Sequence, residues 1–137
     1  MSKRKYSIIA CVHARGHDFR EVNSYTKTHP FQAFLAKIAG QDEKQFLHAE
    51  IAAILAAGGK EIDCLNIYRR DALGNYANAK PCIICQLAIK MFGIKEVYYS
   101  TPTSMKRLEH NVWDDVDISG ILHNKWTRRR RLNTPSK

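Results

Sequence analysis

The chain has 137 residues, 45% of them hydrophobic, which suffices for one domain with a buried core and argues against several domains. Its formal net charge of +9 favours partners that carry phosphate, such as nucleotides or nucleic acids. It contains no run of about 18 apolar residues, and its opening residues lack the apolar segment of a signal peptide, so we expect a cytoplasmic protein without a membrane span.

The first part of the chain predicts a hairpin followed by a short helix. Residues 6–13 are apolar and β-branched, as in a buried strand, and residues 19–27 alternate well enough to form a second strand. The turn around Gly16 would join the two strands. A proline at the start, one apolar helical face and a glycine at the end predict a helix over residues 30–39.

Two helix–strand units follow. Residues 48–57 are rich in helix formers with small side chains and precede two glycines, which predicts a helix that packs closely on a sheet. Residues 63–71 predict the next strand. A second helix would begin near Pro81 and stop at Gly93, and residues 96–101 would form the strand after it. A hairpin followed by two such units predicts an α/β sandwich whose later strands run parallel.

The C-terminal third has weaker patterns. Residues 104–111 could form a short helix, and residues 115–123 a last strand of undetermined direction. We place the domain at residues 1–124 and a basic tail at residues 125–137. The tail, which contains four consecutive arginines, would either be a solvated segment or contact nucleic acid.

Two short motifs, His-Ala-Glu and Pro-Cys-Ile-Ile-Cys, carry residues that bind metals. His48, Cys82 and Cys85 offer one imidazole and two thiolates, the ligand set of a catalytic zinc that keeps a fourth position open for water. Both motifs open predicted helices, where the helix dipole favours thiolate over thiol. Glu50 lies two residues after the histidine, so it points to a different side and could serve as general acid/base beside the metal.

A structural zinc site is the alternative. Such a site is closed by a fourth protein ligand, and Cys11, Cys64, His29 and His110 have no spacing that recommends them for this role. Cys11 and Cys64 lie in apolar stretches, and we interpret them as buried thiols of a protein in a reducing compartment. Taken alone, Glu50 would be a helix N-terminal charge stabilised by the dipole, and only its position beside the cysteines favours a catalytic role.

With H-x-E followed by P-C-x-x-C, the chain resembles the zinc-dependent cytidine/deoxycytidylate deaminase superfamily. The deoxycytidylate deaminase branch, including small phage enzymes, is the most similar, because HAEIAAI and PCIICQLAIKMFGIKEVYYS resemble its zinc helices and the strand after them. The resemblance covers residues 20–101. It implies a three-layer sandwich with a central mixed sheet of about five strands flanked by helices, Zn²⁺ as cofactor, and a homo-oligomer in the cytoplasm of a bacterium or a phage-infected host cell.

The resemblance also implies a reaction, the hydrolytic deamination of dCMP or a related cytosine nucleotide to its uracil form by a zinc-activated water, with Glu50 as the catalytic residue. Substrate contacts would come from Asn23 to the sugar hydroxyl, from Lys27 and His29 to the phosphate, and from Ala49, Asn78 and Ala79 around the base. Lys80 stands where tRNA-adenosine deaminases commonly have glutamate, which disfavours that branch.

The sequence also leaves two alternative functions open. The first is deamination of cytosine or adenine in single-stranded DNA or RNA, which the positive charge and the arginine run favour because a surface that follows phosphates needs distributed cations. The second is a non-catalytic, zinc-containing nucleic-acid-binding module.

Overall fold

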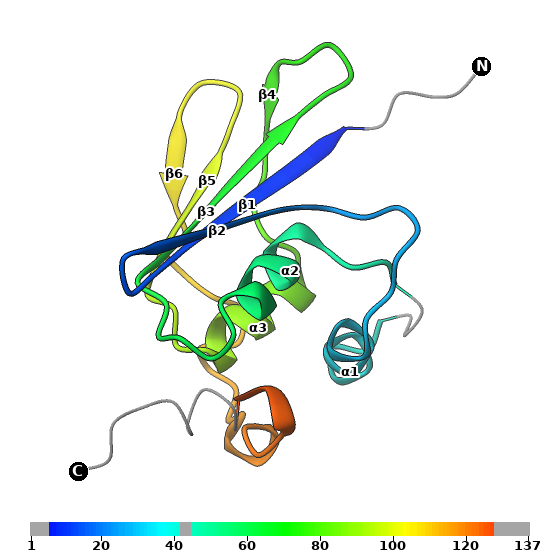
Figure 1. Cartoon of the computed structure of the whole chain (residues 1–137), viewed down its shortest axis with the longest axis vertical. Helices are drawn as coiled ribbons and strands as arrows, with labels where there is room; N and C mark the ends of the chain where they lie inside the picture. The colour runs from blue at the N-terminus through cyan, green and yellow to red at the C-terminus, as the bar shows by residue number, and fades with distance from the viewer. Residues whose placement is uncertain (1–5, 42–44, 128–137) are drawn as a thin grey trace.

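The computed structural model describes residues 6–41 and 45–127 (Figure 1), and within them a six-stranded mixed sheet forms the scaffold. The strand order is β2-β1-β3-β5-β6, with β4 paired to β3 outside this path. The strands are β1 (Ser7–Ala14), β2 (His17–Val22), β3 (Cys64–Arg70), β4 (Tyr76–Ala77), β5 (Glu96–Ser100) and β6 (Met105–Arg107).

The sheet contains both antiparallel and parallel pairs of strands. β1 and β2 form the predicted antiparallel hairpin, and β1 also pairs antiparallel with β3. β3 and β5 run parallel, and the helix between them makes the crossover. These observations confirm the α/β class, the mixed sheet and the parallel pairing of the later strands.

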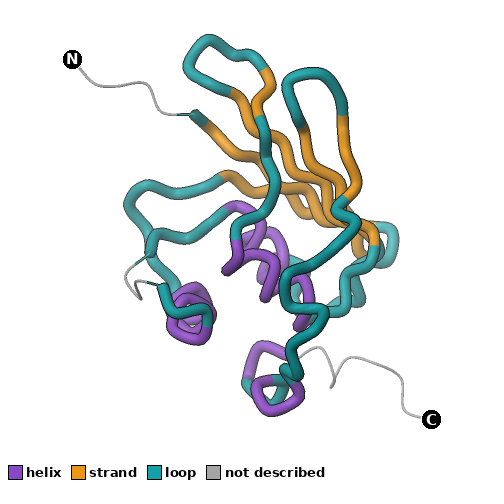
Figure 2. The backbone as a smooth tube through the Cα atoms, turned by 180° about the vertical axis from the view of Figure 1, so that it is seen from behind, coloured by secondary structure: helices purple, strands orange, loops and turns teal. Residues whose placement is uncertain are grey.

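Helices α1 (Pro30–Ile38), α2 (Ala49–Ala56) and α3 (Ile83–Met91) lie on one side of the sheet (Figures 1 and 2). α2 packs against β1 and β2, while α1 contacts α3. The resemblance implied helices on both faces of the sheet, but on the second face none occurs in residues 6–41 and 45–127. That face is therefore formed by the outward side chains of the strands.

The core lies between the sheet and α2 and α3. In β1, every second side chain, at Ala10, Val12 and Ala14, is completely buried, as expected for a strand with one face against helices. Ala49, Ala52 and Ala53 of α2 are buried as well, and their small side chains let the helix lie close to the strands. This close packing brings the start of α2 next to the start of α3.

Two expectations for the C-terminal third are wrong. Residues 105–107, predicted as part of a short helix, form β6, because the Thr101 hydroxyl accepts hydrogen bonds from the backbone of Thr103 and Ser104 and turns the chain back along β5. Residues 115–123, predicted as a strand, contain turns and the 3₁₀ helix η1 (Ser119–Ile121). There the Asp117 carboxylate accepts a hydrogen bond from the Ser119 backbone, which favours a turn over an extended strand.

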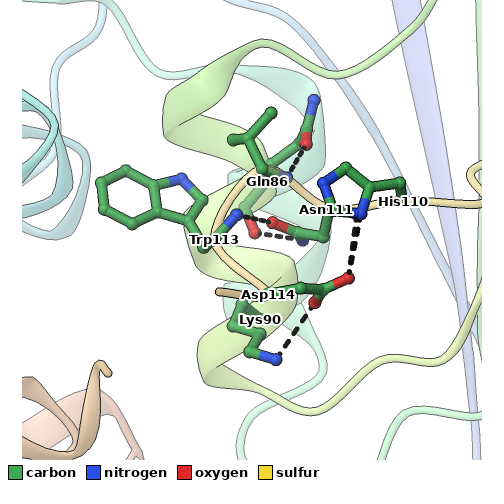
Figure 3. Close-up of polar contacts among 7 residues, drawn as sticks. Gln86, Lys90, His110, Asn111, Trp113 and Asp114 are labelled. Carbon is green, nitrogen blue, oxygen red and sulfur yellow. Dashed lines mark hydrogen bonds and ion pairs between the residues drawn. The ribbon is translucent and has the colours of Figure 1, made fainter. Parts of the chain in front are cut away.

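The segment after β6 is held to α3 by side-chain and backbone hydrogen bonds (Figure 3). The Gln86 side chain accepts from the Val112 backbone N–H at 2.9 Å, and the Asn111 amide donates to the Gln86 carbonyl at 2.8 Å. The Trp113 indole donates to the Ile83 carbonyl at 2.9 Å.

Trp126, two residues past the predicted domain boundary at residue 124, packs on α1. Its ring stacks on Phe31 of α1 with 4.7 Å between centroids and lies 5.5 Å from Phe34. The arginine run at 128–131 of the predicted tail lies outside the described residues. No helix in the described part of the chain is long and apolar enough to cross a membrane.

Candidate active site

Three metal-binding side chains converge where α2 and α3 begin. His48 is the N-cap residue of α2, Cys82 is the N-cap residue of α3, and Cys85 lies in the first turn of α3. Neither N-cap side chain makes a capping hydrogen bond to its own helix, so both are available for other partners. The His48 Nδ1 atom lies 3.3 Å from the Cys85 Sγ and 3.6 Å from the Cys82 Sγ.

These distances fit a zinc ion. Zinc binds imidazole nitrogen at about 2.0 Å and thiolate sulfur at about 2.3 Å. Because the two bond lengths together exceed each nitrogen–sulfur distance, one ion can contact all three atoms, which lie within 4.8 Å of one another. Within the described ranges, no fourth His, Cys, Asp or Glu belongs to this group, so a fourth coordination position is left for a small molecule.

The two cysteines differ in protonation in the metal-free site. A hydrogen bond from Cys85, assisted by one from His48, lowers the pKa of the Cys82 thiol to about 4. Complete burial raises the pKa of Cys85 well above its usual range. One sulfur of the site is thus already a thiolate at neutral pH, and the second loses its proton when a metal binds.

Glu50 stands beside this group, in the first turn of α2. Its side chain is almost completely buried, with 5% of the residue exposed. Burial raises the pKa of its carboxyl group above the ordinary value, so this group binds a proton more readily than an exposed glutamate does. A carboxyl group in this state can both accept and donate a proton next to the metal position.

A cavity of about 520 Å³ opens at this group of residues, and His48, Glu50 and Cys82 form part of its wall. Its volume is in the range of sites for small molecules. The metal position and Glu50 therefore face a space that a nucleotide-sized ligand can enter.

Comparison with known protein families identifies the chain. The model of the cytidine and deoxycytidylate deaminase zinc-binding region matches residues 5–101, which is more than half of the chain. The chain belongs to the cytidine and deoxycytidylate deaminase family. The matched residues include His48, Cys82 and Cys85, and Zn²⁺ is the cofactor that this group fits.

Among solved structures, a Glu-to-Gln mutant of cytidine deaminase from Mycobacterium tuberculosis is similar to this deaminase chain. The two share 18% sequence identity with a TM-score of 0.44, and the match covers 74% of this chain and 72% of that one. A comparison with curated proteins found no match.

The deaminase cavity includes some of the predicted substrate contacts and leaves out others. Asn23, Asn78 and Ala79 line it. Lys27 and His29 do not, and the His29 imidazole instead accepts a hydrogen bond from the Phe31 backbone as the N-cap of α1. The side chain of Ala49 is completely buried beneath the cavity wall and does not line it either.

Arg69, at the end of β3, lines the deaminase cavity and was missed in the sequence. Its guanidinium lies 3.5 Å from the ring centroid of Tyr6, and its Nη1 donates to the Asn78 carbonyl at 3.2 Å. Its Nε is buried without a hydrogen-bond partner among the described residues. Lys80 also lines the cavity, so two cations surround the space next to Glu50. The sequence feature that could have indicated this role of Arg69 is its position as a cation at the carboxyl end of a predicted strand.

Gln32 is a further residue that the sequence did not reveal. It is completely buried in α1, and its Oε1 accepts a hydrogen bond from the His48 backbone N–H at 3.0 Å. This bond satisfies an amide at the start of α2 that the helix itself leaves without a partner. α1 thus helps to position the histidine of the deaminase site. A glutamine on the otherwise apolar face of a predicted helix was the signal for this role.

Proposed function

We propose that this protein hydrolytically deaminates a cytosine nucleotide, dCMP or a related one, to its uracil form. The observation that carries the proposal is that His48, Cys82 and Cys85 converge on one point, and that His48, Cys82 and Glu50 line a cavity that two cations, Arg69 and Lys80, also line. The family to which the chain belongs supports a cytosine deamination activity, and the choice of dCMP rests on the chemistry of the cavity.

In this proposal Glu50 moves the protons of the reaction. Zinc, when bound, lowers the pKa of a water molecule towards neutral. The Glu50 carboxylate takes a proton from the attacking water and passes it to the ring nitrogen N3, which makes C4 electrophilic. After the water oxygen has bonded to C4, Glu50 takes the proton of the new C4 hydroxyl and delivers it to the amine, so that a C4=O group forms. The C4–N bond breaks, ammonia leaves and the uracil form remains.

The cations favour a nucleotide with a phosphate group over a nucleoside. The Arg69 guanidinium has a fixed set of N–H donors that matches phosphate oxygens, and one of these donors has no protein partner among the described residues. Lys80 adds a second positive charge on the same wall. Asn23 remains the proposed contact for the sugar hydroxyl, and Asn78 and Ala79 remain the proposed contacts for the base.

A second candidate is deamination of a base in single-stranded nucleic acid. Three aromatic residues with large exposed fractions line the cavity: Tyr6 at 44%, Tyr25 at 42% and Phe46 at 45%. Exposed aromatic rings beside cations are the arrangement on which unpaired bases stack. The arginine run of the tail, on which this alternative partly rested, lies outside the described residues.

A substrate panel decides between the candidates. The zinc-loaded protein is assayed for ammonia release from dCMP, cytidine, and oligonucleotides containing cytosine or adenine. The proposal predicts the highest kcat/KM for dCMP. Activity restricted to oligonucleotides would replace it with the second candidate, and a zinc-loaded protein without activity on any of these substrates would contradict both and favour the non-catalytic binding module.

The homo-oligomer and the cytoplasmic location remain predictions. Light scattering of the purified protein tests the assembly directly, because a homo-oligomer predicts a mass at least twice that of the 15.7 kDa chain. A mass equal to that of one chain would contradict it.

A further inference from the structure

The sheet face without helices carries a second group of metal-binding side chains. Cys11 and His13 point outward from β1, on the face opposite the buried Ala10, Val12 and Ala14. Asp18 of β2 is the cross-strand partner of His13. The sequence interpretation treated Cys11 as a buried thiol, but its side chain is only partly buried on this face.

The thiol and the imidazole of this group are close enough to share one ion. The Cys11 Sγ lies 3.9 Å from the His13 Nε2, which is less than the combined length of a zinc–sulfur and a zinc–nitrogen bond, at about 2.3 Å and about 2.0 Å. One donor atom of each of the three side chains lies within 4.8 Å of the others. A single ion can therefore contact the Cys11 thiolate and the His13 Nε2 together, with the Asp18 carboxylate beside them on the other ring nitrogen.

One ring nitrogen of His13 is bonded to a carboxylate and the other faces the thiol, as is common for histidines that bind metals. The His13 Nδ1 is hydrogen-bonded to the Asp18 carboxylate, so Nε2 is the ring nitrogen that faces Cys11. A carboxylate on the far nitrogen of a metal-binding histidine fixes the orientation of the ring and makes it a stronger ligand. The side chains of His13 and Asp18 are 38% and 65% exposed, so an ion can reach them from solvent and water can complete its coordination.

We propose that Cys11, His13 and Asp18 form a second metal site that takes a divalent ion of the zinc class and joins β1 to β2. Thiolate with imidazole selects zinc and similar ions over magnesium or calcium, which prefer oxygen ligands. The group uses none of the residues of the deaminase cavity and lies on the other face of the sheet. The second ion is therefore independent of the first and is not required for deamination.

The test is the zinc content of the full-length protein after equilibration with buffered micromolar Zn²⁺. The wild type should bind two zinc ions per chain, and Cys11→Ser and His13→Ala should each bind one. Cys64→Ser is the control, because Cys64 is a partly exposed thiol on the same face, opposite His13 on β3, that accepts a hydrogen bond from Asn66 and does not belong to the group. It should bind two.

Two further readouts keep the result interpretable. Deamination by His13→Ala should equal that of the wild type, which shows that the variant is folded and that the zinc it lost is the second one. Asp18→Asn should keep the site but weaken its zinc affinity by about 10- to 100-fold, the usual effect of losing the partner of a metal-binding histidine. One zinc per chain in the wild type, or two in Cys11→Ser and His13→Ala, would overturn the proposal.

Discussion

Cys82 and Cys85 are three positions apart, yet their thiols have opposite properties. Cys82 is exposed and its pKa is lowered to about 4, mainly by a hydrogen bond from Cys85, whereas burial raises the pKa of Cys85. Burial also raises the pKa values of Cys11 and Cys64 above the ordinary thiol value. The metal-free protein thus contains one thiolate that is accessible from solvent at neutral pH.

This difference predicts selective alkylation. At about pH 6, Cys82 of the metal-free protein should react with iodoacetamide several-fold faster than Cys11 or Cys64, because only the thiolate reacts and the other two thiols remain protonated. The advantage should shrink as the pH rises towards the pKa values of those thiols. Peptide mass mapping measures each rate, and zinc should protect Cys82. Equal rates for the three thiols at the acidic pH would contradict the assigned protonation.

Arg69 offers a test of substrate choice at the scale of one residue. Arg69→Gln should raise the KM for dCMP by about 10- to 100-fold, because a hydrogen bond to a charged group contributes about 1.5–3 kcal/mol, and should leave the KM for cytidine nearly unchanged. Arg70→Gln is the control, since Arg70 bonds to Gly74 and Tyr76 and does not line the cavity. An equal loss for dCMP and cytidine in Arg69→Gln would show that this arginine does not bind phosphate.

At the scale of elements, α3 connects the active site to the C-terminal third. Its first turn carries Cys85, and the same helix holds the segment after β6 through Gln86. The Gln86 side chain is buried, with its Nε2 bonded to the Pro81 carbonyl and its Oε1 bonded to the Val112 N–H. Removing it would leave buried backbone groups without partners.

Gln86→Leu should therefore lower the free energy of unfolding by about 1–3 kcal/mol, the cost of unsatisfied buried groups. Lys90→Met is the control on the same helix, because the Lys90–Asp114 ion pair is partly exposed to solvent, which weakens its contribution to stability. Urea denaturation of both variants gives the comparison. A loss in Lys90→Met as large as that in Gln86→Leu would contradict this ranking.

The elements also show how much could be predicted from the sequence. The starts of α2 and α3 follow from local signals, namely runs of helix formers that begin at the two motifs and end at glycines, and the structure brings the three predicted zinc ligands together. β6 and η1 were not predicted, because side chains in the preceding turns determine them. The role of Gln32 depends on a contact with residue 48 that only the folded chain brings about.

At the scale of the whole molecule, the core between α1 and the last described residues is aromatic. Trp126 stacks on Phe31, which also meets Phe92 edge to face with 5.9 Å between centroids. This cluster joins α1, which positions His48 through Gln32, to the end of α3. The packing of the C-terminal residues thus bears on the stability of the elements around the active site.

Trp126→Ala should lower the free energy of unfolding by about 1–3 kcal/mol through lost apolar burial and ring stacking. Trp126→Phe, which keeps a ring in the same place, should lose less than half as much. Thermal or urea denaturation followed by circular dichroism measures both. If Trp126→Ala is as stable as the wild type, residues 125–127 belong to the tail, as the sequence alone predicted.

The central claim is that a zinc group and Glu50 act together in hydrolytic deamination. The most direct test compares the zinc content and the rate of ammonia release from dCMP in the wild type and in Glu50→Gln. Glutamine keeps the shape of the side chain but cannot carry the proton, so we predict unchanged zinc at the His48–Cys82–Cys85 site and a kcat lower by about 10²- to 10⁴-fold. A zinc-loaded Glu50→Gln protein that deaminates dCMP at the wild-type rate would contradict the account.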